Sequence, residues 1–380
     1  MQRIVVALIL SIFIICTSMG IVNPVVPIYA EKLGATYTDL GLIGVAWSLP
    51  YCIFPILAGM WSNRIGRLRS FLIGVVTCTI VPMLFTISSS LLHIALTRLL
   101  HGFGMSFLWA PGEALISDVT NEDERAKYLG LFNASWSLGY FLGPIVCALV
   151  IDEVGYFGVF WLSFIIGIPS IFIIILLRED VKAGQSIGGG LLLQQFKRVF
   201  VVGSHLYVAI ISSSVVLAMI YSIYPAYLSG LSFSDSEISM FIGILAATRA
   251  LGFWSISIMR RINERKLIIS YLLLQTVTSI LVIEARDFSS IAVVMALMGY
   301  ATSVQIPVIM SMVSRLLKGE VGLPIGVMEA MFGFGWVMGP GIGGFFADYT
   351  SWDGAPYLVM SLISALSLIF FALQSSARKG

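Results

Sequence analysis

Charged residues are scarce in this chain. Only 11% of its 380 residues are Asp, Glu, Lys or Arg, whereas 58% are hydrophobic. A water-soluble domain carries about 25% charged and about 45–50% apolar residues. A chain with so little polar surface cannot face water on all sides, so hydrocarbon is the solvent that most of its surface must meet.

Sequence signatures of common enzyme sites are also missing. The chain has no Gly-x4-Gly-Lys-Ser/Thr phosphate-binding loop, no His-Glu-x-x-His zinc motif and no paired-cysteine metal pattern. Its four cysteines lie inside apolar runs without metal-ligand spacing. The net charge of +2 is too small to indicate a nucleic-acid partner. We therefore expect a protein that is not an enzyme, needs no cofactor or metal, and binds no nucleic acid.

Long apolar runs separated by short polar clusters fill the chain. A helix needs roughly 20 mostly apolar residues to cross a membrane. The runs are continuous rather than alternating, which favours helices over barrel strands. The predicted spans are 4–28, 39–61, 70–88, 91–117, 127–151, 156–177, 201–228, 237–259, 267–284, 288–314, 321–347 and 354–374. The sequence thus predicts an all-α integral membrane protein with twelve transmembrane helices.

The two halves of the chain look like copies of each other. Four residues of the fifth predicted span recur 196 positions later in the eleventh: Gly130, Gly139, Gly143 and Pro144 become Gly326, Gly335, Gly339 and Pro340. Duplicated halves with a binding site at their interface are a known architecture of secondary transporters. We expect two pseudo-symmetric six-helix halves, 1–177 and 201–380, joined by a cytoplasmic linker at 178–200.

Lys and Arg are distributed unevenly among the predicted loops. With a cytoplasmic N-terminus, 18 of the 22 lie in cytoplasmic loops and tails, and only Lys32 and Arg286 lie on the other side. The remaining two, Arg98 and Arg249, lie inside spans. An excess of Lys and Arg marks the cytoplasmic side. We therefore expect a multi-pass protein of the plasma membrane with both termini cytoplasmic.

One loop and one span carry a family resemblance. Residues 59–69 read Gly-Met-Trp-Ser-Asn-Arg-Ile-Gly-Arg-Leu-Arg. This run resembles the signature Gly-x-x-x-Asp-Arg-x-Gly-Arg of the major facilitator superfamily, with Asn63 where the family has Asp. The spacing of Gly139, Gly143 and Pro144 resembles the antiporter motif of its drug–proton antiporter group. The resemblance implies alternating-access transport of a small-molecule solute, coupled to protons, by a monomer in the lipid bilayer.

The resemblance also implies a conformational switch. Arg64 and Arg67 would reach acceptors at neighbouring helix ends in one state and release them in the other, with Asp118 as the nearest candidate by topology. Glycines would let neighbouring helices rock, because they permit close backbone approach. Alternatively, the loop only enforces topology and the glycines only pack. The residues assigned to the switch are Gly59, Asn63, Arg64, Gly66, Arg67, Asp118, Gly130, Gly139, Gly143, Pro144, Gly326, Gly335, Gly339 and Pro340.

Ionisable residues inside spans are few and informative. A charge near the bilayer centre is costly, so such residues usually face a cavity or a partner. In the fourth span Arg98, His101, Trp109 and Glu113 share one helix face. This stripe is either a self-satisfied structural network or the lining of a cavity that binds solute or relays protons.

The eleventh span offers a second carboxylate, Glu329, and Asn133 occupies the equivalent place in the fifth. A carboxyl group away from water can exchange a proton near neutral pH, so Glu329 and Glu113 are the candidate proton carriers. Arg249 could instead hold Glu329 in an ion pair. The predicted cavity residues are Arg98, His101, Trp109, Glu113, Asn133, Trp136, Tyr140, Arg249, Glu329 and Trp336.

Three functions fit these observations. The antiporter-type motifs favour proton-coupled efflux of apolar or amphipathic organic compounds. Arg98 and Arg249 would suit a second function, uptake or exchange of an organic anion or a sugar-like metabolite. The third is a non-transporting membrane receptor. In such a protein the duplicated glycine and proline motifs would have no function.

Overall fold

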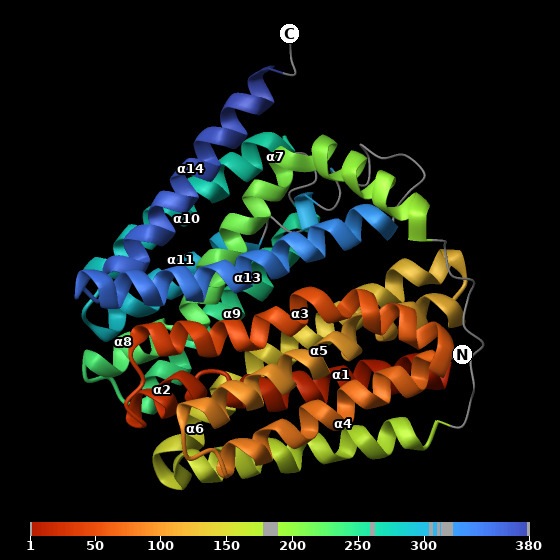
Figure 1. Cartoon of the computed structure of the whole chain (residues 1–380), viewed down its shortest axis with the longest axis horizontal. Helices are drawn as coiled ribbons and strands as arrows, with labels where there is room; N and C mark the ends of the chain where they lie inside the picture. The colour runs from red at the N-terminus through yellow and green to blue at the C-terminus, as the bar shows by residue number, and fades with distance from the viewer. Residues whose placement is uncertain are drawn as a thin grey trace. The chain divides into compact units, whose positions relative to one another are not determined.

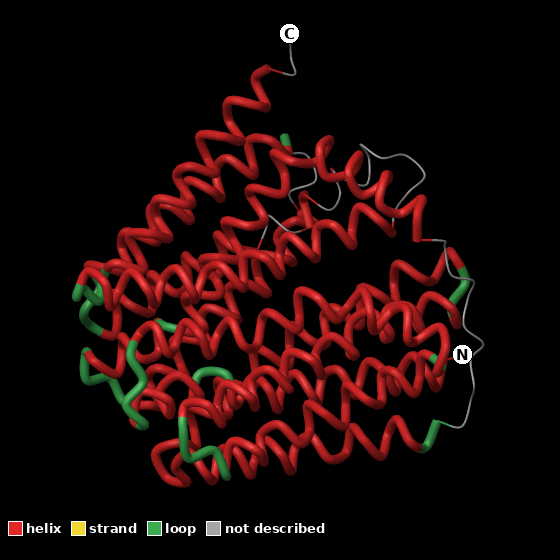
Figure 2. Tube along the Cα trace, in the orientation of Figure 1, coloured by secondary structure: helices red, strands yellow, loops and turns green. Residues whose placement is uncertain are grey.

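The computed structural model of the chain describes residues 2–177, 189–258, 263–303, 307–309, 312 and 322–377. In this part of the chain the regular secondary structure is helical (Figures 1 and 2). The helices are α1 (Gln2–Val22), α2 (Val25–Lys32), α3 (Tyr37–Ile65), α4 (Arg67–Thr86), α5 (Leu91–Val119), α6 (Glu122–Ile175), α7 (Gly189–Ser222), α8 (Tyr224–Gly230), α9 (Asp235–Ile258), α10 (Glu264–Glu284), α11 (Phe288–Ser303), α13 (Gly322–Thr350) and α14 (Ala355–Ala377).

These helices are long and apolar enough to cross a membrane many times. Ten described segments pass that test, and the bent pair Tyr37–Pro55 and Leu57–Ile65 makes eleven. One segment, Lys127–Ile175, has 49 residues, or about 73 Å, which is more than twice the roughly 30 Å of a bilayer core. Non-helical Gly155, at φ 64° and ψ −176°, divides it. Counted as two spans, it brings the total to the predicted twelve, and the all-α membrane fold is confirmed.

Two predicted spans are broken rather than continuous. The first, 4–28, ends as α1 at Val22, and the chain restarts as α2 after Pro24. The seventh, 201–228, ends as α7 at Ser222 and restarts as α8 with Pro225 as its second residue. Proline lacks the N–H that a helix interior needs, but it fits the first turn of a new helix.

The predicted linker, 178–200, is only partly tested. Residues 178–188 lie outside the described residues, and α7 begins at Gly189. The segment 189–200 is therefore helical, and the assignment of 178–200 as a linker between two halves stays a prediction.

Side-chain caps explain where two helices begin. The Thr36 N–H donates to the Asp39 carboxylate at 2.9 Å, and the Asp39 N–H donates back to the Thr36 hydroxyl at 3.2 Å. Ser234 and Glu237 make the same reciprocal pair before α9, at 2.9 and 3.2 Å. Each pair is a capping box, which satisfies backbone donors that no helical partner can reach.

The helices form two compact units. Each unit includes a short segment, called an exchanged segment below, from the part of the sequence that mainly forms the other unit. Unit 1 comprises Met1–Ala35, Ala46–Ser186 and Leu228–Gly243, and unit 2 comprises Thr36–Val45, Ile187–Tyr227 and Ile244–Gly380. The start of α3 thus belongs to unit 2, and the end of α8 with the start of α9 belongs to unit 1. The division into halves at 178–200 stays a prediction.

Hydrogen bonds hold each exchanged segment in its unit. In unit 2 the Asp348 carboxylate of α13 accepts the backbone N–H groups of Tyr37 and Thr38 at 3.2 and 2.7 Å. In unit 1 the Asp235 carboxylate of α9 accepts the Tyr156 hydroxyl at 2.5 Å and lies 3.5 Å from the Lys32 ammonium. Both exchanged segments are therefore fixed by a carboxylate near a helix end.

The core of unit 2 contains a buried amide that is fully bonded. Gln275 of α10 donates to the hydroxyls of Ser212 at 2.9 Å and Ser364 at 2.8 Å, and it accepts from Ser213 at 3.1 Å. These residues come from α7, α10 and α14. Polar side chains in a membrane core join helices because no water is present to replace such bonds.

Glycines allow equivalent helix crossings in the two units. A Cβ placed on Gly143 of α6 would lie 2.6 Å from the Thr17 carbonyl oxygen of α1. A Cβ on Gly339 of α13 would lie 2.7 Å from the Val215 carbonyl oxygen of α7. Only glycine permits backbones to approach so closely. The sequence repeat at 196 positions therefore corresponds to a repeated packing contact.

Replacement of Gly143 by Ala is expected to destabilise the protein. The new methyl group would overlap a backbone oxygen, and overpacking of this kind costs about 1–3 kcal/mol. Thermal unfolding of the purified protein in detergent should show a lower melting temperature. Gly130→Ala is the matched control on the same helix, because nothing lies within 4 Å of its added Cβ. Equal melting temperatures for the two variants would contradict the packing role of Gly143.

Candidate functional site

Aromatic side chains of α5 and α6 form a continuous face in unit 1. Trp109 of α5 packs edge-on against Trp136 of α6, with ring centroids 5.5 Å apart at 76°. Trp136 in turn meets Tyr140 at 5.9 Å and 80°. All three side chains are half-buried. We call Trp109, Trp136 and Tyr140 the aromatic face.

A polar group lies beside the aromatic face. The Trp136 indole N–H donates to the Asn133 side-chain oxygen at 2.9 Å, and the Asn133 amide nitrogen donates to the Leu129 carbonyl at 3.0 Å. The Glu113 carboxyl is half-buried on α5 and interacts electrostatically with the Asn133 side chain. In the described part of the chain, no Lys, Arg or His nitrogen lies within 4 Å of this carboxyl. Glu113 thus has a neutral amide, and no cation of the described residues, among its polar neighbours.

Arg98 and His101 form a second, more deeply buried group, and Arg98 interacts electrostatically with Tyr140 of the aromatic face. Arg98 is 8% exposed, and its guanidinium donates to the Asn23 side-chain oxygen at 3.1 Å and lies 3.4 Å from Nδ1 of His101. His101 is fully buried. Glu113 is 15 positions further along α5, or about 22 Å. The stripe predicted on this helix therefore contains two groups, and His101 does not reach an open surface in this conformation.

Unit 2 contains a second cation with aromatic neighbours. The Arg249 guanidinium of α9 lies 5.6 Å from the centre of the Phe253 ring. Tyr221 interacts electrostatically with Arg249 and stacks on Trp336 at 5.9 Å. The side chain of Glu329 lies outside the described residues, so its predicted pairing with Arg249 stays a prediction.

The loop between α3 and α4 contains an ion pair. The Arg67 guanidinium donates to the Asp118 carboxylate at the end of α5, and it also reaches the Ser62 hydroxyl at 3.3 Å. Gly66 has a φ of 96°, which explains why a glycine separates the two helices. Arg64 is exposed. Of the two arginines assigned to the switch, Arg67 therefore contacts Asp118.

The remaining glycines assigned to the switch fall into three groups. A Cβ on Gly139 or Gly335 would lie 2.7 or 1.9 Å from the opposite helix, so both belong to the close crossings. Nothing lies within 4 Å of a Cβ added at Gly59 or Gly130, so the part of these two glycines in the switch stays a prediction. The surroundings of Gly326 lie outside the described residues. The other residues of the set are Asn63, whose side-chain oxygen is buried without a hydrogen bond in the described part, and Pro144 and Pro340, which lie inside α6 and α13.

Sequence reasoning missed two partners of the candidate residues. Asn23, which bonds to Arg98, lies in the break before Pro24, and an Asn-Pro pair inside an apolar run was the available signal. The second is Tyr221, near the end of the seventh predicted span, which stacks on Trp336 within unit 2. The distance along the sequence gave no indication of that contact.

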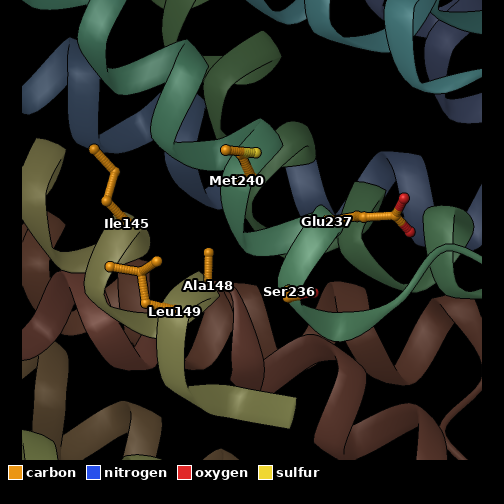
Figure 3. Close-up of a pocket in the computed structure, with 6 residues that line it drawn as sticks. All are labelled: Ile145, Ala148, Leu149, Ser236, Glu237 and Met240. Atoms are coloured by element: carbon orange, nitrogen blue, oxygen red, sulfur yellow. The ribbon is translucent and has the colours of Figure 1, made fainter.

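A pocket of about 190 Å³ lies between α6 and α9 in unit 1 (Figure 3). Ile145, Ala148 and Leu149 line one side, and Ser236, Glu237 and Met240 line the other. The Glu237 carboxylate points away from the α6 side chains and caps α9. The pocket contains none of the predicted cavity residues, so it adds nothing to the candidate site.

These features define a multi-pass membrane transporter. Residues 8–283 and 250–379 match the family model of the Major Facilitator Superfamily, and the chain belongs to that superfamily. It is 25% identical over 356 residues to the quinolone resistance protein NorA of Staphylococcus aureus (strain COL), covering 92% of this chain and 91% of that protein. It is also 25% identical over 354 residues to multidrug resistance protein 1 of Bacillus subtilis (strain 168), covering 90% and 89%.

Solved structures share the fold at low identity. A bacterial homolog to the human lysosomal transporter Spinster, in an inward-facing and occupied conformation, has a TM-score of 0.79 at 14% identity, over 99% of this chain and 97% of that chain. The human organic anion transporter MFSD10 (TETRAN) has a TM-score of 0.69 at 17% identity, over 97% and 99%. These structures confirm the predicted fold, and the family model and the curated relatives confirm the resemblance predicted from the sequence.

Arg67 and Asp118 should be energetically coupled. Their side chains are 13% and 24% exposed, so partial solvent screening limits the coupling to about 0.5–1 kcal/mol. A double-mutant cycle with Arg67→Gln, Asp118→Asn and the double variant measures this coupling from thermal stability. Strictly additive losses would show that the contact contributes nothing.

Proposed function

We propose that this protein is a secondary active transporter that exports small apolar or amphipathic organic compounds across the plasma membrane in exchange for protons. The observation that carries the proposal is the placement of the Glu113 carboxyl, without a cationic partner among the described residues, beside an aromatic face in a membrane span. The names of the 25% identical relatives, quinolone resistance and multidrug resistance proteins, support export of such compounds.

Proton exchange is assigned first to Glu113. A carboxylate in a span is costly unless it faces water or a partner, and Asn133 beside it is exposed. An exposed amide in a span favours water over lipid as its neighbour. Glu113 would therefore take up and release a proton on a water-filled path, with Glu329 as the second candidate.

The solute is assigned to the aromatic face. Trp and Tyr rings supply large flat apolar contacts together with an N–H or O–H group. Compounds that partition into lipid would bind there by burial of apolar area. The corresponding place in unit 2 is Trp336 with Tyr221 and Arg249.

Transport would proceed by alternating access between the sequence halves 1–177 and 201–380. The close glycine crossings at Gly139, Gly143, Gly335 and Gly339 would let helices tilt without opening gaps in the packing. The Arg67–Asp118 pair would form in one state and break in the other. We further propose that both termini are cytoplasmic and that a monomer suffices.

Purified protein in liposomes with an entrapped pH dye tests the proposal. Addition of compounds from a library of lipophilic drugs should drive proton movement through the wild-type protein. Glu113→Gln should reduce this movement about 100-fold or more, the effect expected when a proton-transferring side chain is lost. Glu153→Gln, which changes an exposed carboxylate, is the matched control. If no compound moves protons through the wild-type protein, the coupling proposal is wrong.

A second candidate function rests on Arg98. In the described part of the chain no carboxylate lies within 4 Å of this buried guanidinium, and a buried charge is expected to have a counter-charge. An anionic solute would supply one.

Binding of organic anions to Arg98→Lys and Arg98→Gln variants separates the two functions. An anion carrier should lose about tenfold or more in affinity with Gln and less with Lys, because only Lys keeps the charge. An exporter of neutral compounds should bind its solutes equally well in both variants.

A further inference from the structure

Asp235, at the start of α9, joins the second sequence half to the first within unit 1. Its carboxylate accepts the Tyr156 hydroxyl of α6 at 2.5 Å and lies 3.5 Å from the Lys32 ammonium of α2. The same ammonium lies 4.5 Å from the centre of the Tyr156 ring. Two helices of the first sequence half are thus attached to α9 through one charged oxygen of Asp235.

Asp348, near the end of α13, makes the corresponding connection in unit 2. Its two carboxylate oxygens accept the backbone N–H groups of Tyr37 and Thr38 at 3.2 and 2.7 Å. The first N–H groups of a helix have no partner within the helix and carry partial positive charge, so a carboxylate there is stabilising. The first turn of α3 is therefore capped by a helix from the other half of the sequence.

Each carboxylate lies one turn away from a close contact between the same two sequence halves. In unit 1 the buried Ser239 hydroxyl of α9 donates to the buried Cys147 thiol of α6 at 3.4 Å. In unit 2 a Cβ added to Gly344 of α13 would overlap the Tyr37 carbonyl oxygen of α3. These contacts are lost if either helix pair separates, so Asp235 and Asp348 fasten pairs that are closed in this conformation.

The positions of these residues in the predicted topology suggest a role in the transport cycle. Lys32, Asp235 and Asp348 all fall in predicted loops on the non-cytoplasmic side. We infer that Asp235 and Asp348 are two latches that hold this side of the transporter closed, and that both release the first sequence half when the side opens. The inference rests on the proposed function, in which the two sequence halves alternate and both termini are cytoplasmic.

A latch must hold one state and still allow release. The Lys32 and Asp235 side chains are 54% and 21% exposed, so water can take the place of their bond. Asp348 is exposed as well, and water can satisfy the N–H groups of α3 once the carboxylate has moved away. The Arg67–Asp118 pair differs from both latches, because it joins two helices of the first sequence half.

Alkylation of Cys147 by N-ethylmaleimide measures the opening without any need for transport. Cys147 is fully buried against α9, so it should react only when α6 and α9 separate. In purified protein with the other three cysteines replaced by Ala, Asp235→Asn should raise the alkylation rate about tenfold, the change in an equilibrium that loss of a hydrogen bond to a charged group produces. Glu153→Gln is the matched control, because it changes an exposed carboxylate of α6 and should leave the rate unchanged.

Asp348→Asn distinguishes a latch from a local contact. Asp348 and Cys147 belong to different units, and the bonds of Asp348 to Tyr37 and Thr38 involve α3. A local role of Asp348 would therefore leave Cys147 unaffected, whereas a latch that holds the same side closed should raise the alkylation rate when it is removed. An unchanged rate in either Asp235→Asn or Asp348→Asn overturns the inference, whether or not the wild-type protein moves protons.

A disulfide bond between α6 and α9 provides a functional test. The Ser239 hydroxyl already contacts the Cys147 thiol, so Ser239→Cys places two thiols within reach of a disulfide bond. Oxidation with copper phenanthroline should stop solute-driven proton movement in liposomes, and dithiothreitol should restore it. Ser239→Cys combined with Cys147→Ala is the control and should respond to neither reagent.

Proton movement that continues after the disulfide bond has formed would overturn the inference. Absence of proton movement in the wild-type protein would instead count against the proposed function. The alkylation rates would then still decide whether the two carboxylates act as latches.

Discussion

Every backbone and side-chain polar group in the spans must find its partner inside the protein, because hydrocarbon offers none. This constraint explains why the described elements are helices and why their interiors are joined by bonds such as those of Gln275 to three serines. It also explains why the breaks between α1 and α2 and between α7 and α8 occur at prolines near the ends of spans. The Glu113 carboxyl departs from the usual pairing of charges inside a membrane, since no Lys, Arg or His nitrogen lies within 4 Å of it in the described part of the chain.

The number and nature of the spans were predictable from sequence because a bilayer requires a minimum apolar length. The roles of Gly66 and Gly143 could also be predicted, because a positive φ or a close helix crossing accepts few residues other than glycine. The contacts of individual side chains were harder to predict. Glu113 and Asn133 were both marked as polar residues within spans, but their proximity depends on how α5 lies against α6. His101 shared a helix face with Glu113, yet burial by Trp47 and other neighbours separates it from the open surface.

The duplicated parts of the chain share a helix crossing but carry different side chains at equivalent positions. Gly143 and Gly339 make equivalent crossings, although α6 carries Asn133, Trp136 and Tyr140 where α13 carries Glu329, Phe332 and Trp336. Backbone geometry is thus retained by glycine, while the residues at these equivalent positions differ. A superfamily built on this plan can change its solute without changing its helix crossings.

Neither compact unit is a single continuous stretch of chain. The segment held by Asp348 and the segment held by Asp235 each cross from one sequence half into the unit formed mainly by the other. When a ribosome has released only the first six spans, unit 1 is therefore still incomplete, because its residues 228–243 are synthesised later. Assembly of both units must be completed late in synthesis, and two separately made fragments would have to complement each other before either could reach its final packing.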